Sequence, residues 1–373
     1  MRKSTLFVGL DEAKDSIAVA VAESGREGEV RDYGTIANTP EALTKLVRKL
    51  GRPRDLSFAV EAGPCGYETY RHLKSLGAEC LVVAPSKTPR RPGDRIKNDR
   101  RDAANLARLH RAGELTAVWV PDTESEAMRD LTRSREDGKY AETRARQRLG
   151  SFLLRHGRRY PGRSHWTASH LRWIREQTFP HPAQQICLEE YVKAVEETTE
   201  RVARLAGQIR ELVPQWSMAP VVNALSAHRG VSLIVASTTI AELGDLTRFT
   251  KAREVMGFVG LVPSLADTGL THRTGPITKT GNGHVRRCLV EAAWAYRYPA
   301  RRTAILRKRL EGQPDAVQNI AWKAQVRLCG RYRKLTARGK HHNKVITAIA
   351  RELLGFLWAT ARLVEPSTLG ASQ

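Results

Sequence analysis

Short apolar runs and amphipathic segments follow one another along the first hundred residues in an order that few folds share. Three apolar runs, separated by polar or glycine-containing turns, predict a meander of three strands at residues 5–10, 16–22 and 30–36. A helix is expected next, because residues 38–41 supply a cap, a proline in the first turn and an acid, and apolar residues then recur on one face.

The remaining elements of this region alternate between strand and helix. We expect a strand at 56–60, a helix after Gly63 and Pro64, a strand at 80–84, and then a helix that carries Asp99. Three strands followed by helix, strand, helix, strand and helix is the order of the ribonuclease H-like fold, in which helices form the crossovers between parallel strands. The sequence therefore predicts an α/β domain of this type at residues 1–123.

Carboxylates stand where this fold would bring chain segments together. Asp11 closes the first strand and Glu61 directly follows the fourth, and these two strands are neighbours in the ribonuclease H-like order. Asp99 and Asp102 share one face of the helix that follows. Carboxylates gathered in one place repel each other unless divalent cations neutralise them. Each acid alone is typical of a turn or a solvated helix start, but together they predict a site for two Mg²⁺ ions about 4 Å apart, as in phosphodiester cleavage.

The chain carries a large excess of positive charge. Lys and Arg number 62 against 39 Asp and Glu, a formal net charge of +23, which makes nucleic acid the first partner to expect. No apolar run reaches the roughly 20 residues that span a bilayer, and no signal peptide is recognisable, so we expect a cytoplasmic protein with no membrane partner. The five cysteines are scattered without a CxxC pair, which is typical of buried reduced thiols.

Residues 124–215 have the composition of a charged helical region. Within it Leu188, Val195, Val202 and Ile209 recur every seven residues, and a second, largely apolar series follows three places later. This spacing indicates a coiled coil and thus assembly of the chain into oligomers. An amphipathic helix packed within its own chain shows the same pattern, and both alternatives remain open.

The last part of the chain, residues 216–373, is predicted to be a mostly helical domain. Residues 229–232 and 242–245 resemble a degenerate helix-hairpin-helix, whose backbone N–H groups would face a DNA phosphate. Between residues 269 and 343, Lys and Arg greatly outnumber Asp and Glu, which favours a nucleic-acid surface. The arginines expected to contact phosphates are Arg286, Arg287, Arg301, Arg302, Arg331 and Arg333. Interleaved aromatic residues, Trp294, Tyr296 and Tyr298, either stack on bases or pack in the core.

Taken together, these segments resemble the DEDD, RuvC-like insertion-sequence transposases of family one-ten. The N-terminal resemblance rests on Asp11, the strand end 60–62 and the segment 97–103. The C-terminal resemblance rests on the segments 258–264, 277–282, 286–287 and 290–294. The resemblance implies a DNA transposase or site-specific recombinase that acts on double-stranded DNA at the element ends and the target. It also implies Mg²⁺ on the four acids, a dimer or tetramer and, in some members, a guide (bridge) RNA.

The resemblance further implies a hydroxyl in the C-terminal domain that attacks DNA and forms a covalent link. Members of the family carry a serine just before a glycine at this place, and this chain has Thr268 before Gly269 instead. Ser264, four residues earlier, is the other hydroxyl within reach. Both hydroxyls are also typical of turns, so Thr268 is the first candidate and Ser264 the alternative.

Three other functions fit parts of the sequence. A junction resolvase or DNA invertase would share the first domain, and the C-terminal motifs favour transposition over both. An actin-like kinase also starts with a strand that ends in Asp, but the residues after Asp11 lack the glycines that wrap a phosphate. A nucleic-acid-binding protein with an inactive nuclease fold is opposed by the four intact acids and favoured by the departure at Thr268.

Overall fold

The computed structural model describes residues 5–25, 28–85, 88–89, 98–269 and 271–366. The chain forms two compact units, Met1–Val120 and Pro121–Gln373. The domain boundaries expected at 123/124 and 215/216 stay predictions. Lys97, the first residue of the motif at 97–103, lies outside the described residues.

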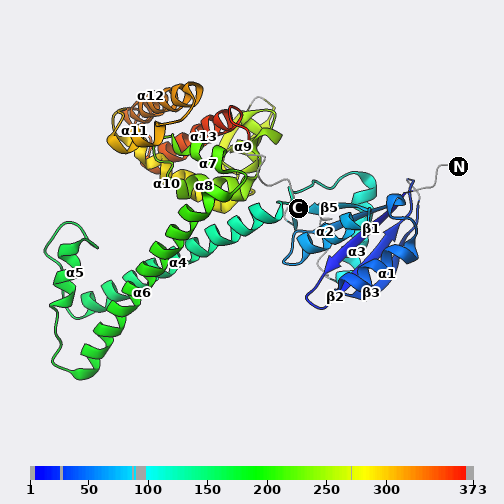
Figure 1. Cartoon of the computed structure of the whole chain (residues 1–373), viewed down its shortest axis with the longest axis horizontal. Helices are drawn as coiled ribbons and strands as arrows, with labels where there is room; N and C mark the ends of the chain where they lie inside the picture. Colours follow the sequence, from blue (N-terminus) through cyan, green and yellow to red (C-terminus); the bar gives the residue numbers. More distant parts are fainter. Residues whose placement is uncertain (1–4, 26–27, 86–87, 90–97, 270, 367–373) are drawn as a thin grey trace. The chain divides into compact units, whose positions relative to one another are not determined.

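The first unit contains a mixed sheet of five strands (Figure 1). Its strands are β1 (Leu6–Glu12), β2 (Ser16–Ala22), β3 (Val30–Ala37), β4 (Leu56–Glu61) and β5 (Glu79–Val83). They lie in the order β3-β2-β1-β4-β5, with β2 antiparallel to both β1 and β3, and β4 parallel to both β1 and β5. The mixed sheet, followed by many helices, fits the ribonuclease H-like fold predicted from the order of the apolar runs.

Two helices cover one face of this sheet. They are α1 (Pro40–Leu50) and α2 (Gly66–Ser75), and a single-turn helix, η1 (Pro53–Asp55), leads into β4. Leu46 of α1 and Leu73 of α2 join Val8 and Leu10 of β1 in one apolar cluster. Burial of these side chains is the main stabilisation of this face, since each buried leucine or valine contributes roughly 1.5–3 kcal/mol.

The opposite face of the sheet is lined by small residues. A third helix, α3 (Asp99–Ala112), lies against it, and its Ala103 and Ala107 pack on Ala18 and Ala20 of β2. Because alanine side chains are short, the backbone of α3 approaches the sheet closely. The position of α3 along the strands is therefore fixed by direct contact between helix and sheet.

In its described residues, the second unit is helical except for one hairpin. Its helices are α4 (Thr123–Arg155), α5 (Ala168–Arg175), α6 (Pro182–Leu212), α7 (Ala219–Ser226), α8 (Leu233–Leu243), α9 (Ala252–Phe258), α10 (Gly283–Ala293), α11 (Ala304–Leu310), α12 (Asp315–Ala337) and α13 (His342–Ala361). Short 3-10 helices are η3 (Val213–Gln215), η4 (Leu246–Arg248) and η5 (Trp294–Arg297). The hairpin strands are β6 (Pro263–Thr268) and β7 (Thr271–Ile277).

The heptad segment forms α6, which lies antiparallel to α4 of the same chain (Figure 1). Leu188 and Val195 are buried in a cluster with Leu149 and Phe152 of α4. Nearer the other end, a Cβ atom on Gly138 of α4 would lie 3.4 Å from Val202 of α6. The heptads therefore pack within their own chain, the alternative that the sequence left open, and assembly of the chain into oligomers stays a prediction.

The main apolar core of the second unit joins α7, α8, α9, α10, α12 and α13. α7 and α8 follow one another through Gly230, and the helix-hairpin-helix expected here stays a prediction. A Cβ atom on Gly230 would lie 2.2 Å from the carbonyl oxygen of Ala292, so the connection packs directly on α10. Tyr296 is fully buried and belongs to this core, whereas Trp294 and Tyr298 are exposed.

Two further expectations concern membranes and thiols. Among the described helices, none is both long enough and apolar enough to cross a membrane. All five cysteines are free thiols, as expected, but only Cys288 and Cys329 are buried; Cys65 and Cys80 are partly buried and Cys187 is exposed, so the prediction that all five are buried is wrong. The exposed residue, Cys187, lies near the start of α6, where the helix turns one face to solvent.

Candidate functional site

The ends of β1 and β4 bring two carboxylates to one edge of the sheet. β1 and β4 are parallel, and their last paired residues are Leu10 and Val60. Asp11 and Glu61 come directly after this pair and therefore lie side by side on neighbouring strands. Side chains alternate between the faces of a sheet, and Ser57 of β4 faces α3, where its hydroxyl lies 2.7 Å from Nε2 of His110. Asp11 and Glu61 therefore lie on the α3 face, and both are partly buried.

The first turn of α3 lies at the same edge. Asn98 caps the helix, since its side chain accepts a hydrogen bond of 3.0 Å from the backbone N–H of Arg100. α3 runs antiparallel to β1: Phe7 packs edge-on against His110 near the end of the helix, while Gly9 contacts Ala103 near its beginning. This direction places Asp99 and Asp102 at the end of β1 that carries Asp11.

We call Asp11, Glu61, Asp99 and Asp102 the acidic edge. Three elements, β1, β4 and α3, supply its members. Within the residues that the structure describes, no three His, Cys, Asp or Glu side chains lie close enough together to form a metal site. The fold thus brings the predicted acids to one edge of the sheet without gathering three of them into a coordination sphere.

Glu12 is a further carboxylate beside the acidic edge, and it was not predicted from the sequence. Glu12 follows Asp11 and points to the opposite face, where a Cβ atom on Gly66 would lie 3.7 Å from its Oε2. In the described structure both oxygens of Glu12 are buried without a hydrogen-bond partner. Burial raises the pKa of Glu12 against an opposing effect of the Thr69 side chain, and the charge of Asp11 adds to the rise. On the same face, burial raises the pKa of the Cys80 thiol to about 12, so this thiol stays protonated.

The two candidate hydroxyls lie on the β6–β7 hairpin of the second unit. Thr268 pairs with Thr271 at the hairpin turn, next to Gly269 with its positive φ of 54°, and is exposed. Ser264 lies nearer the base, and its hydroxyl donates a hydrogen bond of 3.1 Å to the carbonyl oxygen of Pro276. Thr268 is therefore exposed at the turn of the hairpin, whereas the hydroxyl of Ser264 is hydrogen-bonded to the opposite strand.

The base of the hairpin is held by contacts between backbones. Gly260 and Gly281 both have positive φ, and a Cβ atom on Gly281 would lie 1.8 Å from the carbonyl oxygen of Phe258. Arg286 reinforces this contact, because its Nη1 donates to the carbonyl oxygen of Val259 at 2.8 Å. Such a base fixes the direction in which the hairpin leaves the helical core.

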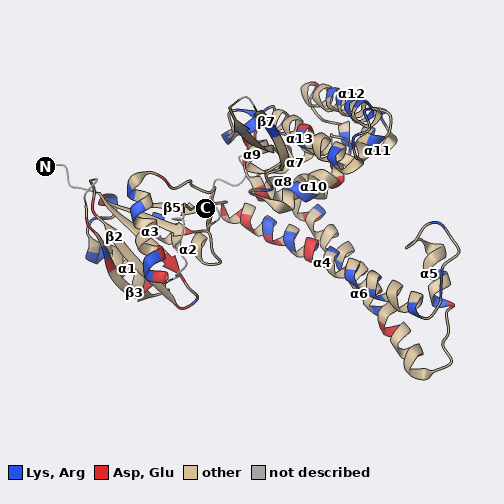
Figure 2. Cartoon of the chain, turned by 180° about the vertical axis from the view of Figure 1, so that it is seen from behind, with Lys and Arg blue, Asp and Glu red and all other residues tan. Residues whose placement is uncertain are grey.

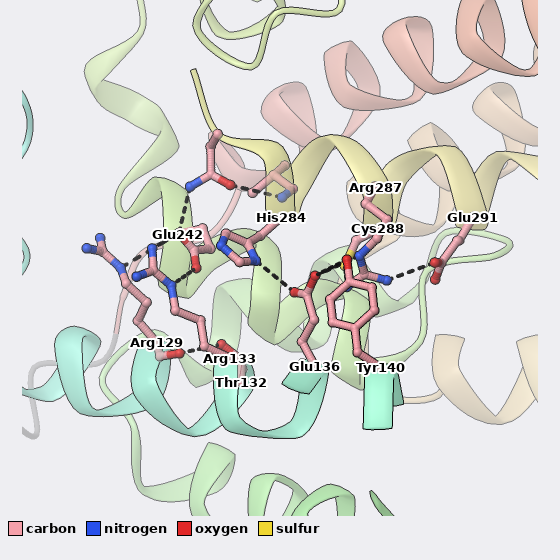
Figure 3. Close-up of polar contacts among 12 residues, drawn as sticks. Arg129, Thr132, Arg133, Glu136, Tyr140, Glu242, His284, Arg287, Cys288 and Glu291 are labelled. Carbon is pink, nitrogen blue, oxygen red and sulfur yellow. Dashed lines mark hydrogen bonds and ion pairs between the residues drawn. The ribbon is translucent and has the colours of Figure 1, made fainter. Parts of the chain in front are cut away.

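Buried carboxylates connect this region to α4 (Figure 3). Asn282 caps α10 and donates a hydrogen bond of 2.6 Å to Glu242 of α8, which also accepts one of 2.7 Å from Arg133 of α4. Glu136 of α4 accepts hydrogen bonds of 2.8 Å from both His284 and Arg287 of α10.

These contacts control the charge of Glu136. Burial by itself raises the pKa of Glu136, but the hydrogen bonds and charges of Arg287 and His284 outweigh this and lower it to about 2. Glu136 is therefore ionised at neutral pH, and α4 and α10 are joined by a charged contact. This contact could not be predicted from the local sequence, because His284 and Arg287 lie about 150 residues after Glu136 along the chain.

The arginines predicted to contact nucleic acid fall into two groups. Arg286 and Arg287 bind groups of their own chain, as does Arg331, whose Nε lies 2.7 Å from Glu352. Arg301, Arg302 and Arg333 are exposed. Arg302 lies over the ring of Trp322, with 5.3 Å between the guanidinium and the ring centre. Lys and Arg are distributed along α4, α6, α11 and α12 (Figure 2), so the second unit offers positive charge on several elements.

Comparison with known proteins gives matches in both units. Residues 8–157 match the model of a DEDD transposase family of IS110 type, and residues 222–307 match that of the transposase IS116/IS110/IS902 family. The putative transposase y4qE of Sinorhizobium fredii is 51% identical over 97% of this chain and 90% of its own length. The transposase for insertion sequence element IS1533 of Leptospira borgpetersenii is 32% identical over 91% of this chain and 99% of its own.

Proposed function

The chain belongs to the IS116/IS110/IS902 family of insertion-sequence transposases and is a DNA transposase, and we propose how its two units share the chemistry. The first unit supplies the acidic edge, and the second supplies the attacking hydroxyl and a surface for DNA. The observation that carries this proposal is the pairing of β1 with β4, which sets Asp11 beside Glu61 on the face that α3 covers.

The acidic edge is proposed to hold two Mg²⁺ ions. Four carboxylates are a donor set that suits a hard divalent cation, and divalent ions are typical of DEDD nuclease-like enzymes. When bound, the ions favour loss of the proton from the attacking hydroxyl and stabilise charge on the leaving oxygen. The carboxylates of the edge would hold these ions.

Thr268 is proposed to be the nucleophile, with Ser264 as the alternative. Its exposed position at the turn of a hairpin with a fixed base supports this choice. In the proposed step a bond forms between Oγ1 of Thr268 and the phosphorus, and the bond from phosphorus to the departing strand breaks. The threonine proton passes to solvent, and the departing oxygen takes up a proton to leave as a free strand-end hydroxyl. Attack by that hydroxyl, or by one from another strand, restores the DNA linkage.

The assembly is proposed to be a dimer or tetramer of this chain that binds double-stranded DNA and a guide RNA. The acidic edge and Thr268 belong to different units, so one protomer is proposed to supply the acids and its partner the hydroxyl. Arg301, Arg302 and Arg333 are proposed to contact phosphates, because their side chains are exposed on the second unit.

The proposal is tested with the purified full-length chain, end-labelled DNA from the flanks of its coding sequence, and the RNA transcribed from those flanks. In Mg²⁺ we expect label linked to protein on a denaturing gel, together with joined DNA products. In EDTA both should disappear. Equal amounts of linked label in EDTA, or none in either condition while the DNA is bound, would contradict the proposed chemistry.

A further inference from the structure

A cavity of about 650 Å³ lies at the start of α8, within the second unit. Several helices contribute to its wall, among them α4, α6, α8, α10 and α11. Five cationic side chains lie on this wall: Arg287, which pairs with Glu136 and Glu291, and four others, Arg135, Arg210, Lys308 and Arg309. We call these four residues and the cavity they line the cationic pocket. The part of its wall formed by Glu136, Arg287 and Glu291 is visible in Figure 3.

The acids on the wall do not neutralise these four cations. Glu136 and Glu291 each lie 2.8 Å from Arg287, so both acids form ion pairs with this fifth cation. None of the ion pairs within the described ranges includes a member of the cationic pocket. Four cations on one wall repel each other, and this repulsion favours an anionic ligand.

Two of the cations, Arg135 and Arg309, are partly buried. In the described structure Nε of Arg135 is buried without a hydrogen-bond partner. Nη1 of Arg309 donates a hydrogen bond of 3.1 Å to the carbonyl oxygen of Val231, just before α8. A donor that is buried and unsatisfied costs about 1–3 kcal/mol, so a ligand with acceptor oxygens would recover stability there.

The start of α8 adds donors of its own. Ser232 caps the helix, and its Oγ accepts a hydrogen bond of 3.3 Å from the backbone N–H of Val235. Leu233 and Ile234 follow it on the cavity wall. The first N–H groups of a helix have no partner within the helix, and they carry the positive end of its dipole. The helix start and the cations therefore favour the same kind of ligand.

We propose that the cationic pocket binds a phosphodiester group of a nucleic-acid strand. The pocket has a volume typical of sites for molecules of nucleotide size, so it accommodates a nucleotide together with its phosphate. Like the family's DNA chemistry, the inference rests on the proposed function, but its residues are separate from the acidic edge and from the hairpin. Binding at the pocket positions a strand on the second unit and takes no part in bond breaking.

The test removes the two exposed cations of the pocket, Arg210 and Lys308, in the double variant Arg210→Gln, Lys308→Gln. Lys45→Gln, Lys49→Gln is the matched control, because it removes the same charge from exposed positions on α1 of the first unit. Binding is measured by fluorescence anisotropy with labelled duplex DNA and with RNA from the flanks of the coding sequence, at several salt concentrations.

For the pocket variant we expect Kd to rise about tenfold at moderate salt, and the salt dependence of log K to fall by about 1.4–1.8, which corresponds to two lost phosphate contacts. The control should change Kd less than twofold. A loss on DNA alone, on RNA alone or on both supports the proposal and identifies the strand that is bound.

Equal losses in the pocket variant and the control would overturn the proposal, because net charge alone would then explain them. Unchanged binding of both polymers would overturn it as well, even if inorganic phosphate competed with either polymer. These outcomes are independent of the proposed function. If the wild-type chain links label in Mg²⁺ and the pocket variant binds nucleic acid normally, the pocket proposal alone is refuted. If the wild-type chain binds DNA but never links label, the proposed chemistry alone is refuted.

Discussion

A Cβ atom on Gly9 would lie 2.1 Å from the carbonyl oxygen of Ala103. Any side chain at position 9 would therefore collide with the backbone of α3, and a backbone atom cannot move aside as the end of a flexible side chain can. This contact sets the distance between β1 and α3 two residues before Asp11 and one residue after Asp102. The geometry of the acidic edge depends on the absence of a side chain at Gly9.

Gly9→Ala is expected to displace α3 and to lower both stability and activity. Overpacking a closely packed site costs about 1–3 kcal/mol, and the contact with backbone places this substitution at the upper end of that range. Chemical denaturation should show the lost free energy of unfolding. Formation of protein-linked label should fall more than the folded fraction does, because the acids move relative to each other.

Gly150→Ala in α4 is the matched control, since nothing lies within 4 Å of a Cβ atom at that position. Alanine in place of glycine within a helix is expected to stabilise by about 0.5–1 kcal/mol. If Gly9→Ala were as stable and as active as wild type, α3 would not be fixed by this contact.

Glu136 makes the stability of the second unit depend on pH in the acid range. Its pKa is lowered from 4.5 to about 2, so the stabilisation is complete above about pH 4.5 and is lost as the pH falls toward 2. Glu136→Gln should lower the free energy of unfolding by about 1–3 kcal/mol at neutral pH. The difference between variant and wild type should shrink as the pH falls through this window.

Denaturation curves collected between pH 2 and 7 measure this difference, with Glu190→Gln at an exposed position of α6 as the control. The control should show no such window. A difference between Glu136→Gln and wild type that is the same at every pH would show that the pair with Arg287 and His284 does not stabilise the fold.

The sheet of the first unit could be predicted from the sequence because its strands are short apolar runs with clear turns between them. The predicted strand at 16–22 is β2 with the same bounds, and β4 is one residue longer than the predicted strand at 56–60, because it ends at Glu61. The order of these elements was enough to predict that β1 and β4 are neighbours. Residues that depend only on strand order, such as Asp11 and Glu61, were therefore placed correctly at one edge of the sheet.

Contacts between residues far apart in the chain could not be predicted in the same way. The number of positive charges does not show that Arg287 forms an ion pair with Glu136. Because of this pair, Arg287 differs from exposed arginines such as Arg302. Heptads cannot show which helix faces them, and here α4 of the same chain does so. Glu12 resembles any polar residue at a strand end until the packing of α2 buries it.

Thr268→Ala is expected to stop the formation of protein-linked label, whereas Thr268→Ser should retain it, since serine keeps the hydroxyl without the methyl group. Ser264→Ala removes the hydrogen bond to Pro276 and should lower stability by about 1 kcal/mol with a smaller effect on linkage. Denaturing gels of the end-labelled reaction measure all three. If Ser264→Ala stopped linkage and Thr268→Ala did not, the roles would be reversed, and linkage in both would favour attack by water or a DNA hydroxyl.

Mixing two inactive variants tests whether partner protomers share one site. Asp11→Asn lacks an acid and Thr268→Ala lacks the hydroxyl, so a mixed oligomer retains one intact combination only if the two groups come from different chains. We expect each variant alone to be inactive and the mixture to recover about a quarter to a half of wild-type linkage, as random assembly of dimers would give. A mixture as inactive as its components would place acids and hydroxyl in the same chain.

The most direct test of the account is DNA cleavage by variants of the acidic edge. Asp11→Asn and Asp102→Asn should each lower the cleavage rate in Mg²⁺ about 100-fold or more, because a ligand of the metal is lost. Stability should be unchanged or higher, since repulsion among the remaining acids is relieved, and DNA binding should persist. Asp15→Asn, at an exposed position after β1, should cleave as wild type does. Cleavage at the wild-type rate by Asp11→Asn or Asp102→Asn would contradict the assignment of the acidic edge as the catalytic metal site.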